Sequence, residues 1–247
     1  MQNYCKTIGV LAAATALVAG NAMAEVEYEL HTGYTSDYLY RGVIIGNNLI
    51  EAGADVKADL GGIGLSAGAW YGSFTNAGDN ANEMDLYTEV SKDLDFLKVS
   101  LGYIYRLYDF GGPGGDFVNY STQEVYAGLS KDLGFAEVSM TYYWGVEGND
   151  QGYYGGKTEG YTELALRRSF EINQCLSLNL GTNVGYLVEG GDFTAWTTKV
   201  ALDWGFAEHA KLSPFGAMSI ALGESTNSLW SSTENEFVAG SMLSVTF

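Results

Sequence analysis

Polar and apolar side chains alternate along most of this chain. In residues 83–91, Glu-Met-Asp-Leu-Tyr-Thr-Glu-Val-Ser, Met84 and Leu86 share one side while Glu83 and Asp85 share the other, because successive residues of a strand point to opposite faces. Similar segments recur to the C-terminus. The pattern predicts an all-β fold, a single transmembrane antiparallel up-and-down β-barrel with its apolar face toward lipid and its acidic face toward the lumen.

Short turns and longer polar segments divide this pattern into strand pairs. The sequence Ser91–Ser100 is nearly repeated at Ser130–Ser139, and Asp- or Gly-centred links of this kind join hairpin strands. Longer Gly-rich segments, the first of them Gly42 to Asn48, separate the pairs, and this asymmetry is typical of outer-membrane barrels. About twelve strands are expected, with ten or fourteen as alternatives, and an even number places both termini at the periplasmic end. The predicted strands are 26–41, 49–60, 62–73, 83–93, 96–108, 120–131, 135–146, 157–169, 176–188, 193–204, 210–222 and 236–247.

The two ends of the chain carry the features of a secreted outer-membrane protein. Lys6 precedes an apolar run, and Ala22-Met23-Ala24 fits a cleavage site, so residues 1–24 are predicted to be a secretory signal peptide, with a retained anchor as the alternative. Cleavage would leave 25–247 as the barrel. The final strand ends in Phe247, a pattern that resembles the signal read by the barrel-assembly machinery of bacteria. Outer-membrane lipid and that machinery are the expected partners.

Composition narrows the class of protein further. The chain has 12 Lys and Arg against 30 Asp and Glu, a formal net charge of −18, and such a field repels nucleic acid. An aromatic content of 14% argues against disorder. Cys5 lies in the predicted signal peptide and Cys175 is the only other cysteine, so we expect no intramolecular disulfide, structural metal or other cofactor.

No pattern of catalytic residues is evident. His31 and His209 are the only histidines, and the sequence has no nucleophile elbow, paired zinc histidines or phosphate-binding loop. His31 is expected to be a polar residue of the lumen face and His209 a residue of a periplasmic turn. We therefore predict that the protein is not an enzyme, and a barrel enzyme is the least favoured interpretation.

Strand parity predicts which charged residues line the lumen. Residues of the other parity, such as Val200 and Trp204, are expected to face lipid. Carboxylates exceed basic residues in the lumen set, which favours a cation-preferring channel for passive diffusion of small hydrophilic solutes. The alternative is that Arg and Lys cross-link the carboxylates into a closed polar core, as in a non-conducting structural or adhesive barrel that displays acidic loops. The predicted pore-lining residues are Asp37, Arg41, Glu51, Asp55, Lys57, Glu83, Asp85, Glu89, Lys98, Arg106, Glu124, Glu159, Glu163, Arg167 and Lys199.

The first third of the mature chain contains recognisable segments: Ser36-Asp37-Tyr38-Leu39-Tyr40-Arg41-Gly42-Val43, Glu51-Ala52-Gly53-Ala54-Asp55, Gly68-Ala69-Trp70-Tyr71-Gly72-Ser73 and Glu83-Met84-Asp85-Leu86-Tyr87. They resemble the opening of the TorF-type porin family. The resemblance implies an outer-membrane barrel with a pore function and supplies no catalytic residues. Asp37 and Arg41 share strand parity, so both are expected in the lumen near its outer mouth, either as a structural ion pair or as a selectivity element.

Overall fold

The structure, a computed structural model, describes residues 26–76, 79–111, 117–147, 160–188, 190–223 and 234–247. The predicted signal peptide and its cleavage site lie outside these ranges. Within them, no helix is both long and apolar enough to cross a membrane.

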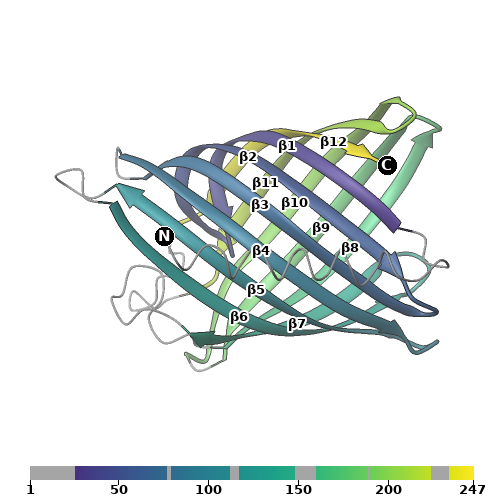
Figure 1. The fold of residues 1–247 in the computed structure, drawn as a ribbon, viewed down its shortest axis with the longest axis horizontal. Coiled ribbons are helices and arrows are strands. Elements are labelled where there is room, and N and C mark those ends of the chain that lie inside the picture. The colour runs from purple at the N-terminus through teal and green to yellow at the C-terminus, as the bar shows by residue number, and fades with distance from the viewer. Residues whose placement is uncertain (1–25, 77–78, 112–116, 148–159, 189, 224–233) are drawn as a thin grey trace.

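Twelve antiparallel strands close into one barrel, in which each strand pairs with its neighbours in sequence and β1 pairs with β12 (Figure 1). The predicted fold class and strand number are therefore confirmed. Most predicted boundaries agree within a few residues, and β2 differs most because it begins earlier. The strands are β1 Val26–Tyr40, β2 Val43–Asp59, β3 Ile63–Asn76, β4 Asp79–Asp93, β5 Lys98–Gly111, β6 Phe117–Asp132, β7 Glu137–Glu147, β8 Tyr161–Asn173, β9 Leu176–Leu187, β10 Asp192–Ala207, β11 Ala210–Ala221 and β12 Glu236–Thr246.

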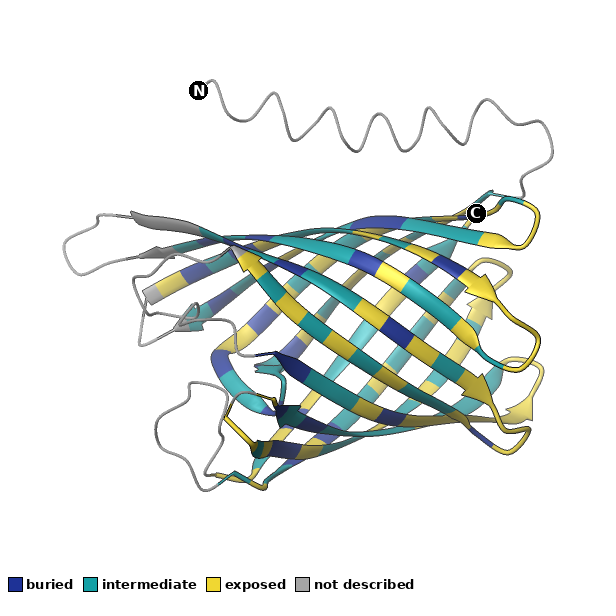
Figure 2. Ribbon diagram, turned by 90° about the horizontal axis from the view of Figure 1, so that it is seen from below, coloured by how far each residue is buried: buried dark blue, intermediate teal, exposed yellow. Residues whose placement is uncertain are grey.

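The outer surface of the wall is apolar. Along β10, the side chains of Trp196, Val200 and Trp204 are exposed, while Lys199 lines an internal cavity. Figure 2 shows the same alternation of exposed and less exposed residues along neighbouring strands. This arrangement follows from the two-residue period of a strand whose two sides meet different surroundings.

In the repeated turn sequence, an aspartate side chain stabilises the short turn by accepting a backbone hydrogen bond. Asp93 Oδ1 accepts the N–H of Asp95 at 2.8 Å, and Asp132 Oδ1 accepts the N–H of Gly134 at 2.7 Å. Asp95 and Gly134 occupy the same place in the repeat and both have positive φ, 68° and 81°. Aspartate and glycine are residues that tolerate this backbone conformation, which explains why the repeat can carry either one.

The barrel closes through a seam between the first and last strands. Glu29 is opposite Thr246, and the N–H of Phe247 donates to the Tyr28 carbonyl at 2.9 Å. The Tyr28 N–H donates in return to the Phe247 carbonyl at 3.2 Å. The C-terminal aromatic residue is thus part of the closure.

The end of the β1–β2 hairpin leaves the wall and folds into the lumen (Figure 1). The predicted loop at Gly42–Asn48 is wrong, because β2 already begins at Val43. Only Arg41 and Gly42 connect the strands, with φ angles of 52° and 90°. Positive φ at both central residues is the requirement of a type I′ hairpin turn. We call residues 37–47 the lumen hairpin.

The lumen hairpin bends inward where β2 breaks its pairing with β3. The β2–β3 register shifts between Asn47 and Ile50, and Asn48 adopts a positive φ of 55°, a conformation that asparagine tolerates better than most residues. Across the bend, Asn47 Nδ2 donates to Asp37 Oδ1 at 2.5 Å. These features turn the hairpin off the wall without ending its strand pairing.

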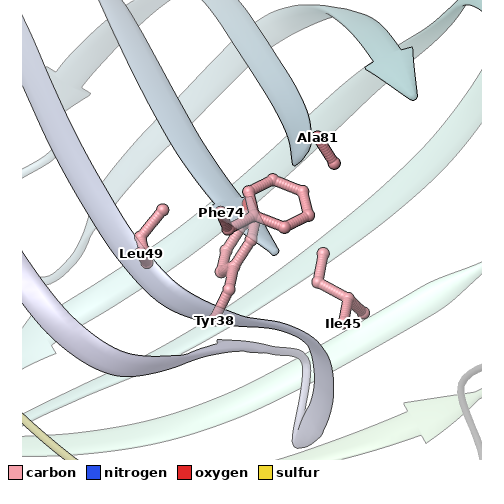
Figure 3. Close-up of a cluster of buried hydrophobic side chains, with 5 residues drawn as sticks. All are labelled: Tyr38, Ile45, Leu49, Phe74 and Ala81. Atoms are coloured by element: carbon pink, nitrogen blue, oxygen red, sulfur yellow. The ribbon is translucent and has the colours of Figure 1, made fainter. Parts of the chain in front are cut away.

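An apolar cluster holds the hairpin against β3 and β4. Its buried members are Tyr38, Ile45, Leu49, Phe74 and Ala81 (Figure 3). The rings of Tyr38 and Phe74 pack edge to face, with centroids 5.2 Å apart. The hairpin lies inside the barrel and packs against β3 and β4, so apolar side chains are buried here on the inside of the wall.

Candidate channel lumen

Arg41, at the tip of the lumen hairpin, reaches the far wall of the barrel. Its guanidinium makes a bidentate contact with Glu124 on β6, with Nη1–Oε1 at 3.0 Å and Nη2–Oε2 at 2.9 Å. The same group lies over the rings of Tyr143 and Tyr161, 4.8 and 4.3 Å from their centroids. Bidentate pairing and cation–π stacking are the two interactions that the planar guanidinium suits best.

The expected ion pair between Asp37 and Arg41 does not form. Asp37 accepts its hydrogen bond from Asn47, while Arg41 pairs with Glu124. The physical reason is that Arg41 belongs to a turn and not to a regular strand, so the spacing of four residues no longer places the two side chains on one face.

Gly42 brings the hairpin tip against β10 and β11. A Cβ atom at this position would lie 2.3 Å from the Cβ of Ala195, far inside van der Waals contact. Ser219 Oγ donates to the Gly42 carbonyl at 3.1 Å. The lumen hairpin therefore spans the barrel, and only glycine fits at its contact with the opposite wall.

Arg106 extends the Arg41–Glu124 pair into a buried charge network. Its Nη1 is 2.7 Å from Glu124 Oε2, and its Nε is 3.3 Å from Asp85 Oδ2 and 4.0 Å from Glu83 Oε1. Glu83 is only 1% exposed. Buried charges are costly unless they are paired, and here two guanidiniums share three carboxylates. The network ties the hairpin to β4, β5 and β6. This part of the lumen therefore has the cross-linked polar core in which arginines pair with carboxylates.

Other predicted lumen carboxylates receive hydrogen bonds from uncharged donors. Such donors hold a carboxylate in place but do not cancel its charge. One of these carboxylates, Asp55, also lies 3.3 Å from His31 Nδ1. The pairs are Trp70 Nε1 to Glu51 at 2.8 Å, Tyr87 Oη to Asp55 at 2.6 Å, Tyr126 Oη to Glu89 at 3.1 Å and Asn183 Nδ2 to Glu163 at 2.8 Å.

The remaining predicted basic residues are more exposed. Lys57 lies 3.8 Å from Glu27, and Arg167 lies 3.8 Å from Glu137, all with side chains about half exposed. Lys199 Nζ lies 3.8 Å from the Phe215 ring centroid. Lys98 is exposed at the start of β5, and Glu159 is outside the described residues.

Open space remains beside the lumen hairpin. A cavity of about 370 Å³ lies between the hairpin and strands β8 to β12. A second cavity of about 580 Å³ reaches the short-turn end at Asp132 and Gly134. The two share Arg167, Gly181 and Lys199, so together they follow one side of the lumen.

The two histidines lie in separate surroundings. His31 is paired with Asp55 inside the barrel, whereas His209 is exposed in a short turn, 4.0 Å from Glu208. In the part of the chain that the structure describes, no group of three or more His, Cys, Asp or Glu side chains could hold a metal ion.

Comparison with known proteins places this barrel in context. A family model described as "Bacterial protein of unknown function (Gcw_chp)" matches residues 19–213. No curated protein matches the sequence.

Several solved structures share the fold. The COG4313 outer membrane channel from Pseudomonas putida F1 is 10% identical, with a TM-score of 0.55 over 90% of this chain and 95% of that chain. The NanC porin is 13% identical, with a TM-score of 0.52 over 88% and 98%. The KdgM porin is 7% identical, with a TM-score of 0.51 over 90% and 99%. The chain thus has a porin-like, outer-membrane β-barrel fold.

Proposed function

The chain belongs to the Gcw_chp family of bacterial proteins of unknown function, and we propose that it is a passive outer-membrane channel for small hydrophilic solutes, narrowed by the lumen hairpin. The observation that carries this proposal is the pair of adjoining cavities, about 370 and 580 Å³, which leave open space beside the hairpin. Named outer-membrane channels share the fold, and the resemblance to TorF-type porins agrees with this role. A channel of this kind requires no catalytic residue.

The proposal includes an orientation. The apolar outer band faces membrane lipid, and the short turns and both termini face the periplasm, as is usual for outer-membrane barrels. Phe247 completes the strand that the assembly machinery would recognise. In this orientation, small hydrophilic solutes or cations would pass through the lumen.

We further propose that the channel prefers cations. Glu51, Asp55, Glu89 and Glu163 are held by uncharged hydrogen-bond donors. Hydrogen bonds from uncharged donors do not cancel the negative charges, and fixed carboxylates in a lumen favour cations.

Conductance across planar bilayers tests both proposals. In a low-salt gradient of KCl, purified folded protein should conduct with a reversal potential that favours potassium. The combined variant Asp55→Asn, Glu89→Gln and Glu163→Gln should weaken that preference, and molar salt should mask it in the parent protein by screening. Lys92→Gln, at an exposed site on the outward side of β4 that it shares with Val90, is the matched control.

The outcomes separate the two claims. Anion preference at low salt would contradict the charge argument while leaving the channel intact. A barrel that is folded yet never conducts would instead support the structural or adhesive alternative, which the buried network of Arg41, Arg106 and their carboxylates favours.

A further inference from the structure

The cavity beside the lumen hairpin has charges of opposite sign on separate sides. Asp37 and Glu51 line it from β1 and β2, whereas Arg167 and Lys199 line it from β8 and β10. In the order of strands around the barrel, β11 and β12 lie between these two sides, and they contribute the uncharged residues Phe215, Ala217 and Val238. The cavity therefore resembles a small compartment with an acidic end and a basic end.

Each of these charged groups has neighbours of its own. Trp70 fixes Glu51 through a 2.8 Å hydrogen bond, and Asn47 fixes Asp37. At the other end, Lys199 Nζ rests over the Phe215 ring. Arg167 lies 3.8 Å from Glu137, but both side chains are about half exposed, and such pairs are weak and screened. The charges thus remain available to a solute.

We propose that this cavity is a binding site for small zwitterions, solutes that carry both an ammonium and a carboxylate group. The ammonium would lie at Asp37 and Glu51, and the carboxylate at Lys199 and Arg167. The inference rests on the proposed channel function and names its substrate class.

Charge and size both support this class of solute. A purely cationic or anionic solute is attracted to one end and repelled by the other, whereas a zwitterion satisfies both. Thr182, Asn183 and Thr197 line the cavity as well and can serve polar substituents. A volume of about 370 Å³ lies at the low end of the range for small-molecule sites, which suits a solute the size of a free amino acid.

Uptake of labelled L-serine into proteoliposomes tests the proposal. Serine, serinol, glycerate and glycerol have similar size and differ in charge: zwitterion, cation at neutral pH, anion and neutral molecule. Serine uptake should saturate, and unlabelled serine should compete more strongly than the other three. Linear uptake at the rate of glycerol would overturn the proposal.

Variants at the two ends identify the site. Glu51→Gln keeps an acceptor for Trp70, and Lys199→Gln removes the opposite charge. Each variant should raise the serine concentration that gives half-maximal uptake by about 1.5- to 5-fold, the range expected for a solvent-exposed ion pair. Lys92→Gln, which lines neither cavity and lies on the outward side of β4, should behave as the parent.

Potassium conductance of the same preparations separates the possible failures. If the parent protein does not conduct, the channel function itself fails. If all variants conduct as the parent does but serine uptake is unaffected by the Glu51 and Lys199 changes, only the zwitterion site fails.

Discussion

Arg41 joins the tip of the lumen hairpin to the far wall of the barrel. It stands on a two-residue turn, and its guanidinium reaches Glu124, 83 residues further along the chain. The contact is bidentate and stacked between aromatic rings. Lysine could not reproduce this geometry, because its ammonium is a point charge without a planar fork.

Replacing Arg41 by Gln should release the lumen hairpin. Glu124 would keep Arg106 but lose its bidentate partner, and breaking a buried pair costs about 3–5 kcal/mol. That cost falls on the hairpin, since the wall keeps its strand pairing. We expect higher and more variable single-channel conductance, with an unchanged shift between heated and unheated protein on a gel.

Lys92→Gln serves as the control for this change. Lys92 is exposed on the outward side of β4, which it shares with Val90, so its charge does not face the lumen. Its conductance should equal that of the parent protein. Parental conductance in Arg41→Gln as well would show that Arg41 does not hold the hairpin in place.

At the level of elements, the wall strands were predictable from sequence and the lumen hairpin was not. A wall strand has lipid on one side and the lumen on the other, so its residues alternate, as at Met84 and Asp85. The hairpin lies inside the barrel, where neither of its faces meets lipid, so this alternation is lost and the sequence of Gly42 to Asn48 predicts a loop. Its contacts at Glu124 and Ser219 lie 83 and 177 residues from their partners, distances that no local pattern encodes.

One local signal for the hairpin is present in the sequence. Gly42 follows Arg41 directly and is itself followed by three apolar residues, which is compatible with a two-residue turn entering a strand. The individual lumen charges were placed by parity, but their pairing was not predictable, because it depends on how far the hairpin bends.

Excising the hairpin tests its role as the narrowing element. Asp37 is directly opposite Asn47 in the β1–β2 register, so residues 38–46 can be replaced by Asn-Gly, a favoured type I′ turn. The barrel should still form, and its conductance should rise severalfold because the obstruction is gone. Replacing Asp95 and its neighbour Leu94 by Asn-Gly, at the opposite end of the barrel, provides the control.

Unchanged conductance after excision would place the narrowest point elsewhere in the lumen. Loss of the folded barrel would show that the apolar cluster around Phe74 is required for assembly, and Arg41→Gln would then be the remaining test of the hairpin's role.

For the whole molecule, the decisive property is that one wall separates two different surroundings. Val200 is exposed to the outside on β10, while the next residue, Ala201, lines the larger cavity. Adjacent positions on a strand therefore differ in the side chains they tolerate, because one faces the outside and the next faces the lumen.

Arginine at these two positions should have different effects. Val200→Arg should destabilise the barrel by about 2–4 kcal/mol if the site lies near the membrane midplane, because a charge then faces hydrocarbon. Ala201→Arg should cost much less, since its side chain enters an open cavity inside the barrel and not hydrocarbon. Urea unfolding in lipid vesicles measures both, and equal penalties would mean that the two faces are assigned incorrectly.

The seam between β1 and β12 affects when the barrel can fold during synthesis. Ser36 Oγ accepts the N–H of Ala239, 203 residues away, so one edge of the first strand has no partner until the last strand has been synthesised. Pairing over such separations is slow, and unpaired edges invite aggregation in the meantime. The strongly negative charge keeps waiting chains apart. Translation must therefore finish before the barrel can close in this register, because a chain truncated ahead of β12 lacks the strand that joins β11 to β1.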